Sequence, residues 1–339
     1  MALLEVKDLR TSFFTDAGEV KAVNGVSFNL ERGKVLGIVG ESGSGKSVTA
    51  YSIMQILAGA GKIVSGSIKL DGQELVNAGE NVMKTVRGNK VSIIFQDPMT
   101  SLNPTYTIGH QLMEAITLHT NRNKAQAKER AIEMLRLVNI NEPEKRMNQY
   151  PFEFSGGMRQ RIMIAMALAC EPDILIADEP TTALDVPIQA QIQELMKSLQ
   201  EEMGMAIIMI THDLGVVAQM CDEVIVMYAG SICEQGTADE IFYNPRHEYT
   251  KGLMRSIPTA DTAGTKLKPI TGTPIDLLNM PKGCPFAPRC DAAMKICLRE
   301  RCERMQINEN HAAACWMNVK LGLENGSIVA AGKKEGGEV

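Results

Sequence analysis

The segment GESGSGKS at residues 40–47 has residue types and a spacing that suit phosphate chemistry. It fits the pattern G-x-x-x-x-G-K-[ST] and stands between an apolar run, KVLGIVG, and a helix predicted from Lys46 to about Leu57. Backbone N–H groups of such a loop surround a phosphate, the lysine supplies a positive charge, and the serine hydroxyl ligates Mg²⁺. We therefore expect a nucleotide-binding site formed by Gly40, Ser42, Gly43, Ser44, Gly45, Lys46, Ser47 and Val48.

Two adjacent carboxylates, Asp178 and Glu179, end the apolar run DILIADEP. Ligands of open α/β sheets bind at the C-terminal ends of the strands, so both side chains are expected at the site. Asp178 is expected to hold Mg²⁺, through water, and Glu179 to polarise the water that attacks the γ-phosphate. The alternative is a solvated strand end that happens to carry two acids.

Two further polar residues follow apolar runs and are expected on the same edge. His212 ends the run MAIIMITHD, and Gln96 follows VSIIF. We expect His212 to contact the γ-phosphate and Gln96 to reach the metal or the attacking water. A lone histidine is more often structural, and a glutamine there carries no signal by itself, so both assignments depend on the neighbouring acids.

A second segment with phosphate-binding character is FSGGMRQR at residues 154–161. Ser155, Gly156 and Gly157 precede a predicted helix, and glycines at a helix start leave backbone N–H groups open to an anionic oxygen. Neither a lysine nor a metal ligand stands beside them in the sequence. These residues therefore predict half of a phosphate site.

The elements that must position these residues are predicted from hydrophobic patterns. Residues 1–32 alternate apolar and polar positions, which is typical of a half-exposed antiparallel sheet. Continuous apolar runs predict buried strands that alternate with helices in a largely parallel sheet. These runs are KVLGIVG, VSIIF, DILIAD, AIIMIT and EVIVMY.

The chain divides into segments of different character. Between Gln96 and Pro151 the strand pattern stops and KAQAKERAIEMLRLV predicts helix, so we expect an inserted helical subdomain at about 97–165. After about Pro245 the apolar strands end. The predicted units are an ATPase domain at 1–244, a cysteine-containing extension at 245–325 and a disordered tail at 326–339.

Composition excludes several classes of protein. The 339 residues are 45% hydrophobic and 22% charged, as in ordinary globular proteins, and the formal net charge of −5 disfavours a general nucleic-acid binder. No apolar run approaches the roughly 20 residues that span a bilayer, and the N-terminus lacks the plan of a signal peptide. We therefore expect the chain in the cytoplasm.

Five of the eight cysteines lie between residues 284 and 315, which suggests a metal in a reducing compartment. Cys284, Cys290, Cys297 and Cys315 have the spacing C-x5-C-x6-C-x17-C. Four thiolates can hold zinc or an iron–sulfur cluster, although these gaps match neither zinc ribbons nor ferredoxins. Unliganded reduced cysteines are the third possibility, with Cys302 as a surplus thiol and His311 as a competing ligand.

Taken in chain order, the motifs resemble those of the ATP-binding cassette (ABC) ATPases over about residues 3–240. The motifs are GESGSGKS, Gln96, FSGGMRQR, ILIADEP, TALD at 182–185 and His212. The resemblance implies a P-loop NTPase core, RecA-like, that hydrolyses ATP with Mg²⁺. It also implies a dimer in which each ATP lies between the phosphate loop of one subunit and the serine–glycine signature of the other, with Asp185 of the TALD motif among the ATP-binding residues.

The usual family signature is LSGGQ, so Phe154 and Met158 depart from it, and Met158 cannot make the hydrogen bonds of a glutamine. The resemblance places Phe13 against the adenine ring. Stacking by Phe14 instead, or core packing of either ring, is the alternative.

The segments FSGGMRQR, QDPMTSLNP at 96–104, NPRHEYTKGLMRSIP and GCPFAPRC resemble one ATPase subunit of bacterial dipeptide and oligopeptide importers. This resemblance reaches Trp316 and implies a [4Fe-4S] cluster on the four cysteines. The implied partners are a second, non-identical ATPase, two transmembrane permease subunits and an extracytoplasmic peptide-binding protein, without nucleic acid, at the cytoplasmic face of the membrane. Alternatives are a nickel importer of the same family, a soluble cassette ATPase acting on ribosomes or DNA, and a nucleotide-sensing switch.

Overall fold

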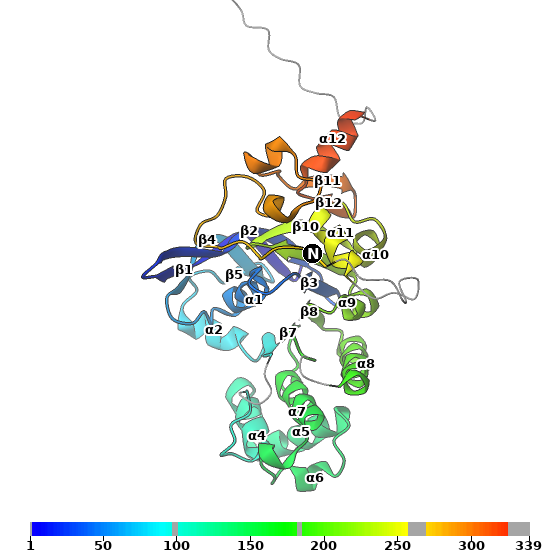
Figure 1. The fold of residues 1–339 in the computed structure, drawn as a ribbon. Helices are drawn as coiled ribbons and strands as arrows, with labels where there is room; N and C mark the ends of the chain where they lie inside the picture. The colour runs from blue at the N-terminus through cyan, green and yellow to red at the C-terminus, as the bar shows by residue number, and fades with distance from the viewer. Residues whose placement is uncertain (1, 97–100, 182–184, 257–268, 325–339) are drawn as a thin grey trace, which may run out of the picture.

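A computed structural model of the chain describes residues 2–96, 101–181, 185–256 and 269–324. Figure 1 shows two sheets with their helices in one part of the molecule and a lobe of helices projecting from it. The predicted fold class is confirmed: an α/β core with a mostly parallel sheet, an N-terminal antiparallel sheet and an inserted group of helices. The predicted tail at 326–339 lies outside the described residues.

The N-terminal residues form the expected antiparallel sheet, with the strand order β2-β1-β4-β5. Leu4, Val6 and Leu9 of the first strand are buried, while polar residues between them are exposed, which is the alternation expected of a half-buried strand. The strands are β1 (Leu4–Thr15), β2 (Gly18–Leu30), β4 (Gly61–Leu70) and β5 (Gln73–Glu74).

The main sheet has the order β11-β12-β10-β9-β3-β8-β7-β6, and its strands from β9 to β6 run parallel. Ile207 and Ile208 are adjacent on β8 and belong to apolar clusters on opposite faces, so this strand is buried on both sides as predicted. The parallel strands are β3 (Val35–Val39), β6 (Val91–Ile94), β7 (Ile174–Asp178), β8 (Ala206–Ile210) and β9 (Glu223–Tyr228).

Helices cover the sheets and form the projecting lobe (Figure 1). The first helix ends three residues earlier than predicted, because Gln55 adopts a left-handed conformation with φ of 49° and stops it. Helices beside the sheets are α1 (Lys46–Met54), α2 (Glu80–Val86), α8 (Val186–Met203), α9 (Leu214–Met220) and α10 (Ala238–Tyr243). The lobe contains α4 (Ile108–His119), α5 (Lys124–Leu137), α6 (Pro143–Arg146) and α7 (Gly156–Leu168).

The α5 helix shows how the sequence specifies the lobe. Asn123 and Gln126 form a capping box that satisfies the first N–H groups of the helix. Ala131, Leu135 and Val138, predicted to share one side, are all buried in the lobe. No helix among the described residues is long and apolar enough to cross a bilayer.

The C-terminal residues add structure that the sequence analysis missed. No apolar strand was expected after about Pro245, and the strands found there are short and of another kind: β12 (His311–Ala313) pairs antiparallel with β10 (Ser231–Thr237) and also with β11 (Met305–Asn308). These short strands lack an apolar pattern, since backbone pairing to an existing edge holds them. Helices α11 (Glu248–Arg255) and α12 (Trp316–Glu324) flank this region. The division at residues 244 and 245 stays a prediction.

Candidate nucleotide-binding site

The predicted phosphate loop joins the buried strand β3 to α1. Gly40 has φ of 152°, and a Cβ there would lie 2.2 Å from the carbonyl oxygen of Met227. Gly45 has φ of 100°, and its Cβ would lie 2.4 Å from the carbonyl oxygen of Ala22. Both positions require glycine, because the loop passes directly against neighbouring backbone. Gly45 caps α1 without a side-chain hydrogen bond, so no side chain occupies the N–H groups that open the helix.

Two polar side chains of this loop are suited to receive a phosphate. Lys46 Nζ donates hydrogen bonds to the carbonyl oxygens of Gly40, at 2.8 Å, and Glu41, at 3.1 Å. Burial lowers the pKa of Lys46, while the carboxylates of Glu179, Asp178 and Glu41 act to raise it. Ser44 Oγ is buried and finds no hydrogen-bond partner within the described part of the chain. An unsatisfied buried hydroxyl and a lysine that rests on carbonyls both fit an anionic ligand.

Asp178 and Ser47, which the sequence analysis expects to hold Mg²⁺, contact each other. Ser47 Oγ donates to Asp178 Oδ1 at 3.0 Å, and the Tyr51 hydroxyl donates to Asp178 Oδ2 at 3.1 Å. Burial raises the pKa of Asp178, and the hydrogen bonds from Ser47 and Tyr51 act against that rise. Hard oxygen donors of this kind fit Mg²⁺. Tyr51 was missed in the sequence, although it follows Ser47 by four residues and therefore shares its helix face.

Glu179, Gln96 and His212 are brought together from the ends of β7, β6 and β8. Gln96 Nε2 donates to Glu179 Oε2 at 2.9 Å, and His212 Nδ1 lies 3.4 Å from Glu179 Oε1. Glu179 has φ of 49°, and its N–H donates to the carbonyl oxygen of Ile210 at 2.8 Å. A non-glycine residue in this conformation is uncommon, and here it turns the chain sharply at the end of β7. The geometry suits the predicted base and its neighbours.

The serine–glycine segment lies apart from the phosphate loop. Ser155 caps α7 by accepting a hydrogen bond from the N–H of Met158 at 3.4 Å, and α7 packs on α5, α4 and β6. Figure 1 shows α7 in the helical lobe and α1 beside the sheets. Asp185 is exposed at the start of α8, and residues 182–184 of the TALD motif lie outside the described residues. The pairing of this segment with a second chain stays a prediction.

The phenylalanines Phe13 and Phe14 lie on β1, pointing to opposite faces. Phe13 is partly buried and pairs with Gly61 of β4, where a Cβ would come within 2.7 Å of its ring. Phe14 is 48% exposed. Packing on Gly61 agrees with the structural alternative for Phe13, and its contact with adenine stays a prediction.

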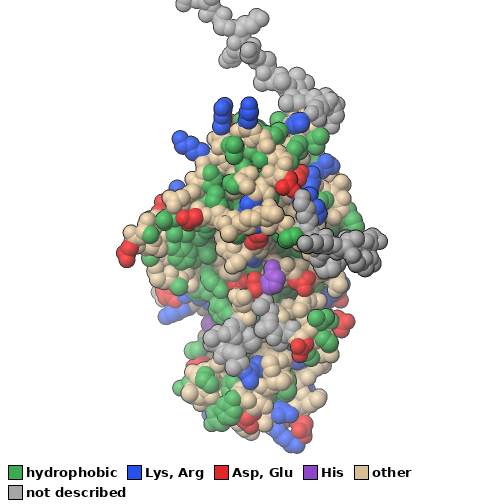
Figure 2. Space-filling view, in the orientation of Figure 1, with side chains coloured by type: hydrophobic (Ala, Val, Ile, Leu, Met, Phe, Trp, Pro, Cys, Tyr) green, Lys and Arg blue, Asp and Glu red, His purple; other side chains and the backbone are tan. Residues whose placement is uncertain are grey.

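Charge on the visible surface agrees with the composition. Figure 2 shows Lys and Arg side chains in small groups, with acidic side chains elsewhere on the same face. A nucleic-acid backbone is bound by a continuous basic stripe or patch. Among the described residues shown in this view, the basic groups do not merge into such an area.

The five clustered cysteines come close together in the C-terminal region. Cys284 N–H donates to the carbonyl oxygen of Cys297 at 2.7 Å. Burial, and then the thiols of Cys315, Cys284 and Cys297, raise the pKa of Cys302 to about 12. Within the described ranges, no group of three or more His, Cys, Asp or Glu side chains could hold a metal ion. The iron–sulfur assignment is therefore not confirmed.

His311 does not act as the competing ligand that the sequence suggested. Its Nε2 lies 2.7 Å from Glu234 Oε1, and its Nδ1 lies 3.2 Å from Glu240 Oε2. The ring is buried, at 1% exposure, and engaged on both sides by carboxylates. His311 instead fixes β12 to β10.

Comparison with known proteins identifies the family. The ABC transporter family matches residues 23–182, and the family described as oligopeptide/dipeptide transporter, C-terminal region, matches residues 233–297. The oligopeptide transport ATP-binding protein OppD of Bacillus subtilis is 55% identical over 93% of this chain and 88% of its own length. The dipeptide transport ATP-binding protein DppD of the same species is 52% identical over 93% of this chain and 94% of its own.

A solved structure shares the cassette part of the fold. A dimeric post-hydrolysis state of the ATP-binding cassette MJ0796, bound to ADP and Pi, has a TM-score of 0.62 and 26% identity, covering 69% of this chain and 98% of its own. The sequence matches over 93% of the chain, together with the phosphate loop and the carboxylates beside it, lead to one conclusion. The chain belongs to the ABC transporter ATPases, in the family of oligopeptide and dipeptide transport ATP-binding proteins.

Proposed function

We propose that the chain is the ATP-hydrolysing subunit of a membrane importer for dipeptides or oligopeptides. The observation that carries this proposal is the joint presence of a complete phosphate loop with its carboxylates and a C-terminal region matched by the peptide transporter family. The relatives in Bacillus subtilis are named for oligopeptide and dipeptide transport, which supports peptides as the cargo.

The residues have distinct proposed roles in hydrolysis. Lys46 and the loop N–H groups bind the phosphates, and Ser47, Asp178 and Gln96 supply oxygen atoms that would hold Mg²⁺. When bound, Mg²⁺ neutralises negative charge on the β- and γ-phosphate oxygens. Glu179 accepts the proton of the attacking water. The 2.9 Å hydrogen bond from Gln96 orients its carboxylate for this role. His212 contacts the γ-phosphate beside it.

A second cassette completes each site in this proposal. Ser155, Gly156 and Gly157 bind the γ-phosphate held by the partner's loop, with Asp185 at the same interface. Closure around ATP encloses the phosphate in fixed dipoles, and hydrolysis loosens the dimer. The dimeric MJ0796 structure supports pairing of cassettes. The proposed partner is a second, non-identical ATPase, with two permease subunits and an extracytoplasmic peptide-binding protein, at the cytoplasmic face of the membrane.

Isolation of the protein with its native neighbours tests the importer proposal. We expect ATP hydrolysis by the assembled complex in membranes to rise when peptide-loaded binding protein is added, because substrate arrival is coupled to cassette closure. The matched control is the same binding protein without peptide. Stimulation only by nickel-loaded binding protein, or recovery of the chain on ribosomes, would favour one of the alternative functions.

We also propose that Cys284, Cys290, Cys297 and Cys315 hold a [4Fe-4S] cluster with a structural role. Support comes from the electrostatic interactions among their thiols, which place them near one another, and from the fact that soft thiolates are the usual ligands of such clusters.

Iron analysis tests this cluster. Protein purified without oxygen is expected to contain equal amounts of iron and acid-labile sulfide and to absorb visible light, and Cys290→Ser should lose most of both. Cys170→Ser is the matched control, because Cys170 lies in the helical lobe, where its thiol donates to the carbonyl oxygen of Ala115. Wild-type protein free of iron and sulfide would reject the cluster.

A further inference from the structure

The C-terminal extension reaches the phosphate loop through Arg289. The Arg289 guanidinium donates to both carboxylate oxygens of Glu41, with distances of 2.5 Å and 2.9 Å. Glu41 is the second residue of the loop GESGSGKS. Bidentate pairs of this kind are strong and directional, and the Arg289 side chain is only 6% exposed. A residue 248 positions away in sequence therefore holds a loop side chain.

Two further N–H donors of Arg289 are also occupied. Arg289 Nε donates to the carbonyl oxygen of Thr271 at 2.9 Å, and one terminal nitrogen donates to the Tyr228 hydroxyl at 3.3 Å. The guanidinium carbon lies 5.9 Å from the centre of the Tyr228 ring. These contacts come from the extension on one side and from β9 on the other. Together, the contacts with Thr271 and Tyr228 hold the planar guanidinium in the orientation that pairs with Glu41.

The backbone of Glu41 is held as well. Its N–H donates to the Tyr249 hydroxyl at 2.8 Å, and Tyr249 is fully buried on α11. Phe286, three residues before Arg289, packs against Tyr249 with ring centres 5.3 Å apart. One aromatic layer therefore supports both contacts to Glu41.

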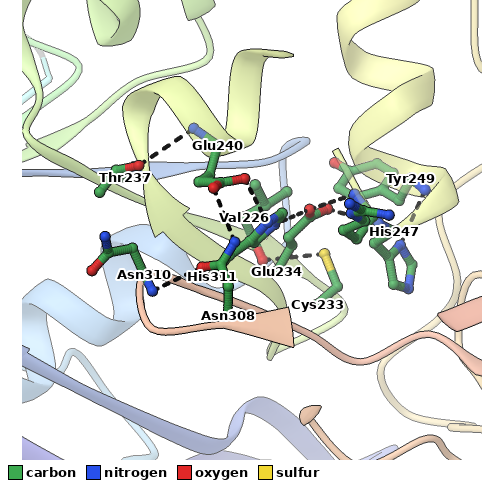
Figure 3. Close-up of polar contacts among 11 residues, drawn as sticks. Val226, Cys233, Glu234, Thr237, Glu240, His247, Tyr249, Asn308, Asn310 and His311 are labelled. Carbon is green, nitrogen blue, oxygen red and sulfur yellow. Dashed lines mark hydrogen bonds and ion pairs between the residues drawn. The ribbon is translucent and has the colours of Figure 1, made fainter. Parts of the chain in front are cut away.

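A buried carboxylate anchors this layer to the main sheet (Figure 3). Glu234 of β10 accepts hydrogen bonds from the N–H groups of Arg246, at 2.6 Å, and His247, at 2.8 Å. His247 Nδ1 in turn accepts from the N–H of Tyr249 at 3.0 Å. Glu234 also binds His311, which joins β12 to the same anchor. The start of α11 is thus fixed by hydrogen bonds to the sheet that carries the loop.

The charge of Glu41 makes these contacts matter for nucleotide binding. Lys46 Nζ rests on the carbonyl oxygens of Gly40 and Glu41, so the conformation of Glu41 also sets the position of the lysine. A carboxylate in this loop repels the phosphates of a bound nucleotide unless a cation neutralises it. Arg289 is the cation paired with it.

We propose that Arg289 is a positioning residue for ATP binding, through which the C-terminal extension neutralises Glu41 and fixes the geometry of the phosphate loop. The inference rests on the proposed function of that loop. It assigns Arg289 no contact with the nucleotide, because Arg289 acts through Glu41. It also explains why an arginine of the extension is buried against a loop in the other half of the sequence.

Full-length Arg289→Ala tests the proposal by MgATP binding and steady-state hydrolysis. We expect the Kd and KM for MgATP to rise on the order of tenfold, because the released Glu41 carboxylate repels the phosphates. The kcat at saturating ATP should change less than about threefold, since Glu179 and Gln96 are untouched. Arg289→Lys should recover part of the loss. Arg299→Ala, an exposed arginine of the same extension, is the control and should match wild type.

The Glu41→Gln background separates this role from a purely structural one. There Arg289→Ala is expected to change the Kd less than about twofold, because no carboxylate remains to be neutralised. An equal loss in both backgrounds would show that Arg289 acts only through general stability and would overturn the inference. Wild-type protein that fails to bind MgATP would instead overturn the proposed function.

A third variant keeps the inference testable if Arg289→Ala does not fold. Glu41→Gln alone leaves Arg289 in place and removes the negative charge, so it should bind MgATP at least as tightly as wild type. Weaker binding by folded Glu41→Gln, judged by its circular dichroism, would contradict the electrostatic basis of the inference.

Discussion

Replacing Glu179 with glutamine is expected to reduce ATP hydrolysis by about 10²- to 10⁴-fold while ATP binding survives. Glutamine has the size of glutamate and can still accept a hydrogen bond from Gln96, which donates to Glu179 at 2.9 Å. It cannot take a proton from water. The variant should therefore remain as an ATP-bound dimer, detected by size-exclusion chromatography with MgATP and by phosphate release.

The control for this substitution is Glu194→Gln, which makes the same chemical change at an exposed position of α8. It should hydrolyse ATP at the wild-type rate. If Glu179→Gln also does so, Glu179 is not the base, and the assignment passes to another group at the end of β7 or β8.

In dimers formed from two copies of this chain, Ser155→Asp is expected to abolish hydrolysis, because it places a charge where the γ-phosphate of each copy is proposed to bind. Two unit charges 4 Å apart repel by about 4 kcal/mol at an effective dielectric constant of 20, so we expect a loss of at least about 100-fold. Aspartate caps helices as well as serine does, so α7 should keep its N-terminal hydrogen bond. Ser155→Asn, which caps without a charge, is the matched control and should retain most activity.

Mixing experiments show in which subunit the effect of Ser155→Asp lies. The phosphate loop of the variant is unchanged, so it should bind ATP with wild-type affinity. Hydrolysis should fail because the aspartate blocks the site that is formed with the loop of the partner. When it is mixed with an inactive Lys46→Ala chain, one site of each mixed dimer has an intact loop and an intact signature. Hydrolysis should therefore reappear. A mixture that stays inactive would place both residues in the same site.

Much of the fold follows from local patterns. The run AIIMI becomes β8 because a strand buried on both faces needs continuous apolar residues. The loop glycines are predictable because Gly40 and Gly45 face backbone at distances that no side chain tolerates. Asp178 and Glu179 were located by a rule of sheet topology that requires no knowledge of the other strands.

The parts that escaped prediction depend on long-range contacts. The ion pair of Arg289 with Glu41 joins residues 248 positions apart, and the hydrophobic pattern of neither segment predicts this contact. The strand at His311–Ala313 forms only because β10 presents an open edge to it. The iron–sulfur assignment came from the resemblance to importer subunits, because the spacing of the cysteines does not by itself show what the thiols bind.

The antiparallel pairing of β12 with β10 covers an edge of the main sheet, so a shortened protein would lose this cover. The solved cassette MJ0796 is covered almost completely by 69% of this chain, which invites trimming to a minimal catalytic unit. A cut before residue 305 would strip β11 and β12 from β10 and expose its unpaired backbone groups to other molecules. The truncated protein would then aggregate through the exposed edge of β10, and the resulting loss of activity would be mistaken for a defect in catalysis.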